Sequence, residues 1–329
     1  LSPAQIKNIE DDLGGDVTVI DRSMLILDIF ALHAVTDEGK IQVELAQLQY
    51  SSPRLVGRGT EMSRQGGGIA SRGPGETKLE TDRRRVRARM AALRRELDRI
   101  ARERELRRYA RKRSGIMTVA IAGYTNAGKS TLLNYLTGAG ILAEDKLFAT
   151  LDPTSRAIEL PDGRSLLLVD TVGLIRRLPH HLVEAFKSTL EEAAFADVIV
   201  KVADAGDAQA AEQLAVTDDV LGSLDCADIP QLVVYNKCDT ANTVAFDPDI
   251  LLTSAKTGYG LPALLAKLDE VLNHRVRTIE IVLPYDKLAL ADILRSRGSV
   301  AAEEYREDGV YYRATVKIDD LHRFEEFLV

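Results

Sequence analysis

The sequence predicts an α/β fold in three parts, and three patterns along the chain indicate it. Between residues 117 and 272, apolar runs of strand length alternate with helical patterns, which is typical of a mainly parallel sheet with helices on both faces. Before this region, two helical segments repeat apolar residues at heptad spacing and predict an antiparallel helical hairpin. After residue 275, a strand, helix, strand, strand, helix order predicts a small α+β module.

Composition sets broad limits on the class of protein. The 329 residues carry 43 Lys and Arg against 50 Asp and Glu, a net charge of −7, and 45% are hydrophobic. A chain of this length suggests two or three domains. It contains no apolar run of about 18 residues, so we expect no membrane span. Cys226 and Cys238 provide neither a disulfide framework nor a zinc spacing. We therefore expect a cytoplasmic protein, and we predict that it is a monomer.

The charge is unevenly distributed, which the total conceals. Residues 54–113 hold 20 Lys and Arg against 8 Asp and Glu, a net of +12, so the rest carries −19. Such a split indicates a segment that faces a polyanion. Most charged runs are only solvated faces. Within residues 83–113, however, 15 basic residues stand against four acidic ones, and most are arginines, which suit phosphates and base stacking. This favours an RNA surface.

Residues 1–113 are expected to form a partial α/β domain that carries the hairpin. Ser2 and Pro3 predict the N-cap and first position of a short helix. Residues 17–20 (V-T-V-I) predict a strand, and Asp21 predicts the start of a second helix. Because one strand cannot make a sheet and the chain does not begin with Met, we expect a fragment that begins inside this domain.

The hairpin is expected over about residues 27–113. Its first helix repeats apolar or small residues near heptad spacing, with Glu38 breaking one step, at Leu27, Ala31, Ala34, Ile41, Leu45 and Leu48. Its second helix has an a/d seam with steps of 4, 3, 4 and 3, at Val86, Met90, Leu93, Leu97 and Ile100. The Gly-rich connection, residues 65–77, suits either a flexible linker or close approach of its backbone to RNA.

Residues 114–275 contain the strongest motif. A strand at 117–122 leads into G-Y-T-N-A-G-K-S, which fits G-x-x-x-x-G-K-S and precedes a helix. Such a P-loop wraps phosphates with backbone N–H groups at a helix N-terminus. Lys129 is expected to bridge the β- and γ-phosphates and Ser130 to ligate Mg²⁺. The predicted nucleotide contacts here are Gly123, Tyr124, Thr125, Asn126, Ala127, Gly128, Lys129, Ser130 and Thr131.

Two further segments are predicted to sense the γ-phosphate. D-T-V-G at residues 170–173 follows an apolar strand, so Asp170 would hold Mg²⁺ through water and the Gly173 N–H would meet γ-phosphate. In F-A-T-L-D-P-T at residues 148–154, Thr150 is the candidate Mg²⁺ ligand, Thr154 is its rival, and a simple capping role is the alternative. The predicted catalytic residues are Lys129, Thr150 and Gly173, the metal ligands are Ser130, Thr150 and Asp170, and further nucleotide contacts are Phe148 and Ala149.

Base recognition is predicted from N-K-C-D at residues 236–239. The Asp239 carboxylate can accept bonds from N1–H and the 2-amino group of guanine, donors that adenine lacks. Lys237 would pack over the base, and Asn236 would tie this loop to the P-loop. In the next loop, Ser254, Ala255 and Lys256, the Ala255 N–H would meet guanine O6. Four motifs, each at a strand's end, predict a P-loop GTPase domain that binds GTP and GDP with Mg²⁺.

Two positions bear on hydrolysis. Leu174 stands where signalling GTPases often carry the glutamine that orients water. Since leucine cannot orient water, we expect slow hydrolysis alone, with an external group adding roughly 10³–10⁵ in rate. Asn126 resembles the potassium-binding asparagine of cation-dependent GTPases, while a local loop hydrogen bond is the alternative.

Residues 276–329 are expected to form the C-terminal α+β module. Strands are predicted over 279–283, 300–305 and 310–317, and helices over 287–295 and 321–328. Glu307, Asp308 and Gly309 predict the turn between the last two strands.

Nearly the whole chain resembles the HflX family of GTPases. The resemblance lies in R-G-P-G-E-T-K-L-E-T-D-R-R-R at 72–85, in residues 148–154, and in D-T-V-G-L-I-R-R-L-P-H at 170–180. It departs at Leu174, where the family usually has Phe, and the family begins with a fuller N-terminal α/β domain. The resemblance implies a GTPase that binds the large ribosomal subunit with GTP, is stimulated by the ribosome, and splits or rescues ribosomes under stress. It also implies that the N-terminal domain and basic hairpin reach ribosomal RNA near the peptidyl-transferase centre.

Two alternatives to this function remain open. The chain could be a ribosome-assembly GTPase that binds subunits without splitting ribosomes. It could also be a signalling GTPase whose hairpin binds a protein partner. RNA binding through several phosphates predicts a steep salt dependence, whereas a protein partner predicts a weak one.

Overall fold

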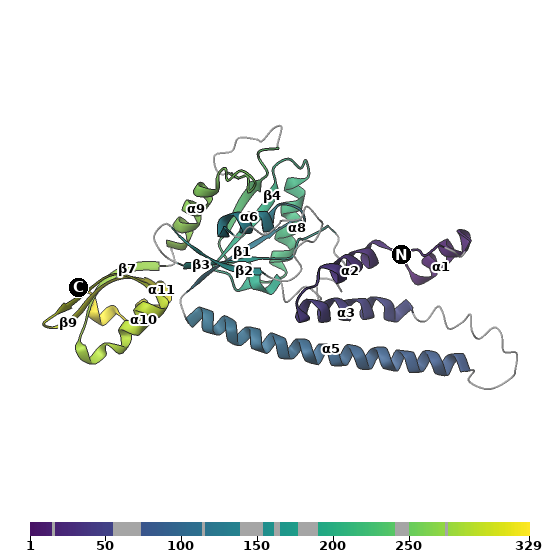
Figure 1. Cartoon of the computed structure of the whole chain (residues 1–329), viewed down its shortest axis with the longest axis horizontal. Helices are drawn as coiled ribbons and strands as arrows, with labels where there is room; N and C mark the ends of the chain where they lie inside the picture. The colour runs from purple at the N-terminus through teal and green to yellow at the C-terminus, as the bar shows by residue number, and fades with distance from the viewer. Residues whose placement is uncertain are drawn as a thin grey trace. The chain divides into compact units, whose positions relative to one another are not determined.

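The structure of the chain is a computed structural model. It describes residues 1–14, 17–54, 74–113, 116–138, 154–160, 165–176, 190–240, 250–273 and 276–329. The described residues fall into two compact units, one through Arg104 and the other from Glu105 onward, so the boundary lies within one long helix, α5 (Pro74–Arg113). Figure 1 shows this helix beside the shorter N-terminal helices. None of the helices within these ranges combines the length and the apolar character needed to cross a membrane.

The regular elements among the described residues of the first unit are all helices. It contains α1 (Pro3–Asp12), α2 (Arg22–His33), α3 (Asp37–Ser51), the short 3-10 helix η1 (Ser52–Arg54) and most of α5. The caps are those predicted: Ser2 forms a capping box with Gln5, and the Asp21 carboxylate accepts the Met24 N–H. The predicted strand at residues 17–20 is wrong. The Val19 N–H donates to the Glu10 carboxylate, so this extended segment uses a side chain in place of a neighbouring strand.

Helices α3 and α5 run antiparallel and form the predicted hairpin (Figure 1). The α5 seam matches the predicted one: Leu93 is buried, and the other four seam residues are partly buried between exposed neighbours. Arg89 adds a bidentate contact, donating to both carboxylate oxygens of Glu44 at 2.6 and 2.7 Å. The first arm differs from the prediction. It is two helices, because Ala34 is extended and Thr36 caps a new one.

The break in the first heptad pattern at Glu38 has a structural reason. The Glu38 carboxylate forms an ion pair with Arg104 of α5, and both side chains are largely buried. Arg104 follows Ile100 by four residues and so continues the α5 seam. The charged residue in the first arm therefore meets an arginine placed at a seam position of the second arm.

The second unit contains a six-stranded sheet of β1 (Met117–Gly123), β2 (Thr154–Glu159), β3 (Ser165–Asp170), β4 (Val198–Asp204), β5 (Gln231–Asn236) and β6 (Leu251–Leu252). The strand order is β2-β3-β1-β4-β5-β6, with β2 antiparallel to β3 and the other pairs parallel. This confirms the mainly parallel α/β fold. Three helices that pack on it are α6 (Lys129–Thr137), α8 (Ala210–Gly222) and α9 (Leu261–Asn273).

Alternation along the strands gives the sheet two apolar faces. In β1, Val119 and Ile121 join a core with α6 and α9, whereas Ala120 and Ala122 join a second core with Leu221 of α8. Small residues on the second face allow α8 to approach closely. The sheet thus has helices on both faces, as the sequence predicts.

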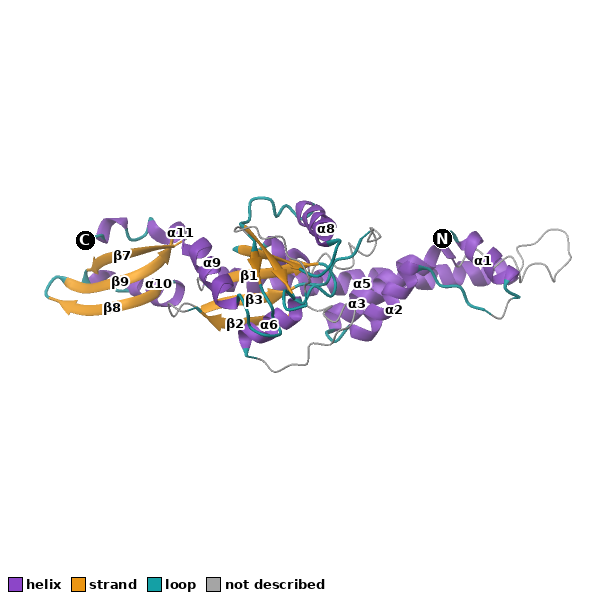
Figure 2. Cartoon of the chain, turned by 90° about the horizontal axis from the view of Figure 1, so that it is seen from above, coloured by secondary structure: helices purple, strands orange, loops and turns teal. Residues whose placement is uncertain are grey.

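The C-terminal module is a three-stranded antiparallel sheet with strand order β7-β9-β8 (Figure 2). Its elements are β7 (Val276–Leu283), η2 (Tyr285–Lys287), α10 (Ala289–Arg297), β8 (Ser299–Arg306), β9 (Gly309–Lys317), α11 (Ile318–Leu321) and η3 (Glu325–Phe327). The predicted helix at 321–328 is wrong. The Val329 N–H donates to the Glu280 carbonyl and Leu328 bridges Ile281, so the chain end pairs with the β7 edge.

Candidate nucleotide site

Three predicted motifs lie at the carboxyl ends of β1, β3 and β5, and residues 254–256 follow the end of β6 closely. Parallel neighbouring strands bring these ends to one edge of the sheet, where open α/β sheets bind ligands. The edge therefore collects residues that are up to 132 positions apart, from Gly123 to Ala255.

The glycines of the P-loop are required by its geometry. Gly123 has φ +151°, and a Cβ there would lie 2.3 Å from the Val202 carbonyl oxygen. Gly128 has φ +92°, and a Cβ there would lie 2.2 Å from Asn236 Nδ2. Between them Asn126 also adopts a positive φ of 63°. A side chain at either glycine would displace the neighbouring strand or loop.

Lys129 is the buried cation of the site. It is 6% exposed, and its Nζ donates to the Tyr124 carbonyl at 2.9 Å. Burial lowers the pKa of Lys129 to about 8, and the nearby Asp170 carboxylate opposes this shift. The ammonium lies inside the loop that would wrap the phosphates, where an anionic ligand would favour its charged form.

Ser130 and Asp170 join the P-loop to the end of β3. The Ser130 hydroxyl donates to Asp170 Oδ2 at 2.7 Å, and Asp170 is 1% exposed. A hydroxyl and a carboxylate are the hard oxygen ligands that Mg²⁺ prefers. The two predicted metal ligands in the described residues are therefore adjacent and chemically suited to that ion.

The D-x-x-G segment is held against the P-loop by contacts that the sequence did not predict. The Thr125 N–H donates to the Leu174 carbonyl at 2.8 Å, and the Leu174 N–H donates to the Gly123 carbonyl at 3.1 Å. Two residues later, the Arg176 N–H donates to the Tyr124 hydroxyl at 3.1 Å. A Cβ at Gly173 would lie 2.9 Å from Thr125 Cα. The D-x-x-G segment and the P-loop are thus packed directly against each other.

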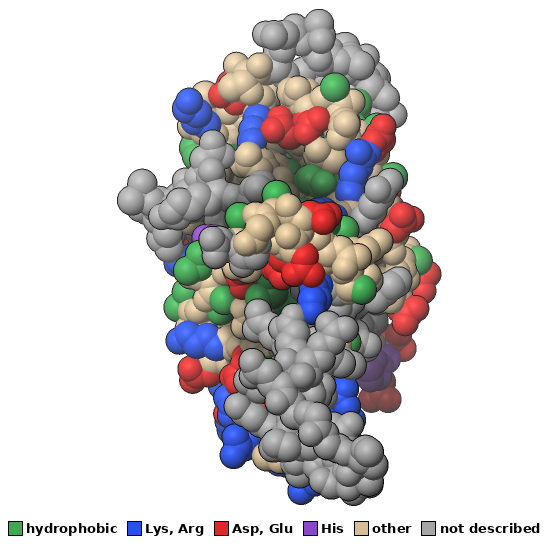
Figure 3. Space-filling view, turned by 90° about the vertical axis from the view of Figure 1, so that its right-hand side faces the viewer, with side chains coloured by type: hydrophobic (Ala, Val, Ile, Leu, Met, Phe, Trp, Pro, Cys, Tyr) green, Lys and Arg blue, Asp and Glu red, His purple; other side chains and the backbone are tan. Residues whose placement is uncertain are grey.

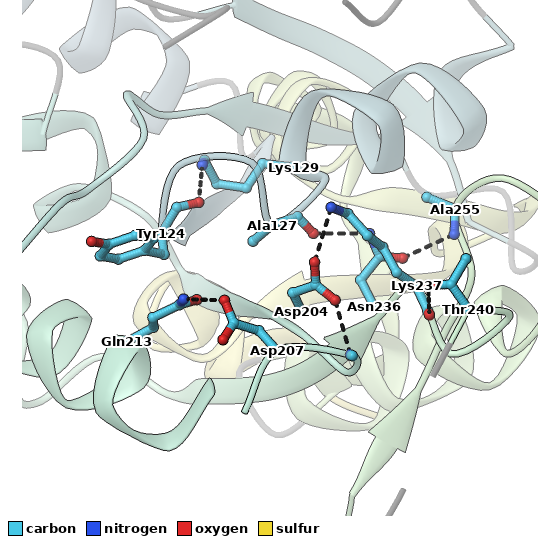
Figure 4. Close-up of polar contacts among 11 residues, drawn as sticks. Tyr124, Ala127, Lys129, Asp204, Asp207, Gln213, Asn236, Lys237, Thr240 and Ala255 are labelled. Carbon is cyan, nitrogen blue, oxygen red and sulfur yellow. Dashed lines mark hydrogen bonds and ion pairs between the residues drawn. The ribbon is translucent and has the colours of Figure 1, made fainter. Parts of the chain in front are cut away.

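Asn236 occupies the centre of the predicted base-binding region (Figure 4). Its Nδ2 donates to the Ala127 carbonyl at 3.0 Å, which is the tie to the P-loop that the sequence predicts. Its Oδ1 accepts the Ala255 N–H at 2.9 Å. The N–H assigned by prediction to guanine O6 therefore already has an intramolecular acceptor in this structure.

Lys237 has a partner that sequence reasoning missed. It adopts a positive φ of 62°, and its Nζ lies 2.9 Å from Asp204 Oδ2 at the end of β4 (Figure 4). The other Asp204 oxygen accepts the Gly206 N–H at 2.9 Å. The sequence did contain a signal for this partner, because Asp204 is a carboxylate at the end of the apolar run that forms β4. This ion pair fixes the Lys237 side chain within the predicted base-binding region.

The remaining predicted contacts differ in exposure. Asp239 and Lys256 are exposed, whereas Ser254 is buried and its hydroxyl accepts the Thr257 N–H at 3.2 Å. Thr154, the rival to Thr150, begins β2 and pairs with Asp170 in the sheet register. The predicted contacts Phe148, Ala149 and Thr150 lie outside the described residues.

The lowered Lys129 pKa gives a testable pH dependence. Phosphates raise the pKa of a contacting lysine, so the nucleotide complex retains the proton that the free chain loses near pH 8. We expect GDP affinity to fall by about tenfold per pH unit above pH 8. Titrations from pH 7 to 9, below the range in which guanine loses its own N1 proton, measure this. Lys129→Arg, which stays charged, should give a flat profile, and an equally flat wild-type profile would contradict the assignment.

Comparisons with known proteins agree with this geometry. Family models described as GTP-binding GTPase N-terminal, GTP-binding GTPase Middle Region and 50S ribosome-binding GTPase match residues 1–31, 33–111 and 118–237. The GTPase HflX of Lacrimispora saccharolytica is 50% identical over 321 residues, which are 96% of this chain and 75% of that protein. The chain belongs to the HflX family of GTPases. Accordingly, it binds and hydrolyses GTP.

Further relatives show how widely the HflX family match extends. The Escherichia coli GTPase HflX is 44% identical over 319 residues, covering 94% of this chain and 74% of that protein. A GTP-binding protein from Sulfolobus solfataricus, solved in complex with GDP, is 28% identical with a TM-score of 0.50, covering 83% of this chain and 78% of that one. The GDP bound to the Sulfolobus protein supports nucleotide binding by the present chain.

Proposed function

We propose that this chain is a cytoplasmic, monomeric ribosome factor that binds the large ribosomal subunit in its GTP state and splits or rescues ribosomes under stress. In this proposal the basic hairpin contacts ribosomal RNA, and the ribosome accelerates an otherwise slow GTP hydrolysis. The observation that carries it is an arginine surface on α5 joined to a complete P-loop site. The match to a family model named for 50S ribosome binding supports the choice of partner.

The arginine surface consists of Arg87, Arg94, Arg95 and Arg102, which we call the arginine stripe. Separations of seven, one and seven residues place them on one face of a helix. All four are exposed, and within the described part of the chain none forms an ion pair. Figure 3 shows Lys and Arg side chains gathered at the lower margin of that view. Unneutralised guanidinium groups in a row suit a phosphate backbone.

In the proposed nucleotide complex, Lys129 bridges the β- and γ-phosphates, and the Gly173 N–H meets the γ-phosphate. Ser130, Asp170 and Thr150 would hold Mg²⁺, which neutralises phosphate charge when it is bound. Asp239 would accept the guanine donors. Asn126, with its positive φ, would contribute to a K⁺ site.

Leu174 explains why a partner is needed for fast hydrolysis. Its side chain is 1% exposed, and both its backbone groups bond to the P-loop. It therefore leaves no polar side chain at this position to orient water. A group supplied with the ribosome would fill that role and could add roughly 10³–10⁵ in rate.

Sucrose-gradient sedimentation distinguishes splitting from the alternatives. Joined ribosomes incubated with the chain and a non-hydrolysable GTP analogue should separate into subunits, with the chain on the large one, whereas GDP should leave them joined. Unchanged joined ribosomes with chain bound only to free large subunits would favour an assembly GTPase. No association with either species would leave a signalling GTPase with a protein partner.

A further inference from the structure

Helix α5 changes character along its buried seam. From Val86 to Ile100 the seam positions are apolar, but the next two on the same face are Arg104 and Arg108. Each of these arginine side chains is 13% exposed, whereas their neighbours Arg102 and Arg107 are exposed. The seam therefore ends in two largely buried arginines.

The two arginines have partners in different units. Arg104 pairs with Glu38 in the first unit, and Arg108 pairs with Glu192 in the second. Each unit thus holds the helix through one of these largely buried ion pairs, and the two arginines lie one helical turn apart. A small displacement of either side chain makes or breaks an ion pair, because its hydrogen bonds require a fixed geometry. Apolar side chains can slide past one another and still keep contact.

The contacts of Arg108 are specific. Its Nε and one terminal nitrogen both donate to Glu192 Oε1, at 3.0 and 2.7 Å. Its guanidinium carbon lies 4.2 Å from the centre of the Phe195 ring. The Glu192 side chain is 7% exposed, so loss of Arg108 would take a strong ion pair from a largely buried carboxylate. Arg108 therefore binds residues 192–195 by charge, hydrogen bonds and ring contact together.

The topology shows why these residues meet. Arg108 precedes β1 by nine residues and Glu192 precedes β4 by six, and β1 and β4 are parallel neighbours. Asp197 joins the beginnings of these two strands, because its carboxylate accepts the Thr118 N–H of β1 at 2.9 Å. The chain from β3 to β4 begins at the D-x-x-G motif and ends here. In sequence, Glu192 therefore lies between the D-x-x-G motif, the proposed γ-phosphate sensor, and β4.

We propose that Arg108 is a positioning residue that links the nucleotide state of the GTPase unit to the arginine stripe, through its ion pair with Glu192 and its contact with Phe195. The inference rests on the proposed function, in which α5 is the RNA-facing helix. When residues 190–194 respond to the γ-phosphate, the paired arginine moves α5. RNA bound to α5 acts on the GTPase through the same pair, since coupling is reciprocal.

Hydrogen exchange measures the link without ribosomes. Amides of residues 100–113 should exchange at rates that differ at least about fivefold between GDP and a non-hydrolysable GTP analogue. Arg108→Gln and Glu192→Gln should each abolish the difference, and the double variant should equal either single one. The control Lys201→Gln breaks a similar ion pair with Asp218 in the same unit and should keep the difference.

Each exchange result either supports or overturns the proposed link through Arg108. Phe195→Ala alters an exposed ring and should fold normally, so a reduced difference in this variant supports the link even if Arg108→Gln is unstable. Nucleotide-independent exchange in the wild type, or a full difference in Arg108→Gln, would overturn it.

With ribosomes, Arg108→Gln should lower the stimulated kcat several-fold at unchanged KM for GTP. If ribosomes do not stimulate GTP hydrolysis by the wild type, the proposed function is wrong. The hydrogen-exchange result still tests the link between the nucleotide state and α5 independently.

Discussion

Lys129→Ala is expected to reduce GTP hydrolysis by about 10²–10³-fold, because it removes a buried positive charge placed to stabilise phosphate charge in the transition state. The ammonium is 6% exposed and held on the Tyr124 carbonyl inside the P-loop. Its lowered pKa shows that burial opposes the charge when no phosphate is present. Single-turnover hydrolysis with the purified chain measures the loss.

Folding can be separated from chemistry in this experiment. Since burial disfavours the Lys129 charge, the nucleotide-free alanine variant should unfold at a temperature close to that of the wild type. Only the extra stability conferred by bound nucleotide should be lost. Lys267→Ala, an exposed lysine paired with Glu270 on α9, is the matched control and should hydrolyse GTP normally. Hydrolysis by Lys129→Ala within a few-fold of wild type would contradict the phosphate assignment.

Asp239→Asn is expected to reverse the base preference from GTP toward xanthosine triphosphate. A carboxylate accepts from the guanine 2-amino group, whereas an asparagine amide can donate to the oxygen that xanthine carries there. Two charge-assisted hydrogen bonds at roughly 1.5–3 kcal/mol each predict a loss of GTP affinity of about 10²–10⁴-fold. Competition binding with both nucleotides measures the reversal.

The position of Asp239 makes this substitution informative. The side chain is exposed, so the exchange to Asn should leave folding unaffected. Asp228, another exposed aspartate of the same unit, provides the control as Asp228→Asn and should retain GTP preference. Retained GTP preference in Asp239→Asn as well would show that another group reads the base.

Much of the site could be predicted from sequence because each motif follows a strand, and parallel strands collect such motifs at one edge. The tie from Asn236 to Ala127 follows from that rule. The α5 seam was equally readable, since a helix repeats its buried face locally. These predictions depend on local periodicity and on one topological principle.

Contacts between distant segments could not be predicted in the same way. The bond from Arg176 to Tyr124 uses a backbone N–H and a hydroxyl, groups that carry no periodic signal. The Lys237–Asp204 pair needs the relative placement of β4 and β5. Glu38 was visible in the sequence as an interruption of the heptad pattern. Its ion pair with Arg104 could not be predicted, because it depends on how α3 and α5 pack. Residues 17–20 have strand composition, but no strand in the described part of the chain pairs with them, and β propensity takes effect only beside such neighbours.

Binding to isolated large ribosomal subunits as a function of salt tests the central claim most directly. With a non-hydrolysable GTP analogue, log affinity should fall steeply and linearly with log salt concentration. Arg94→Gln combined with Arg95→Gln and Arg102→Gln should lower that slope by about two to three, since each phosphate contact contributes roughly 0.7–0.9. GDP should weaken binding strongly. Affinity that is insensitive to salt, or unchanged by the three substitutions, would contradict RNA recognition by the arginine stripe.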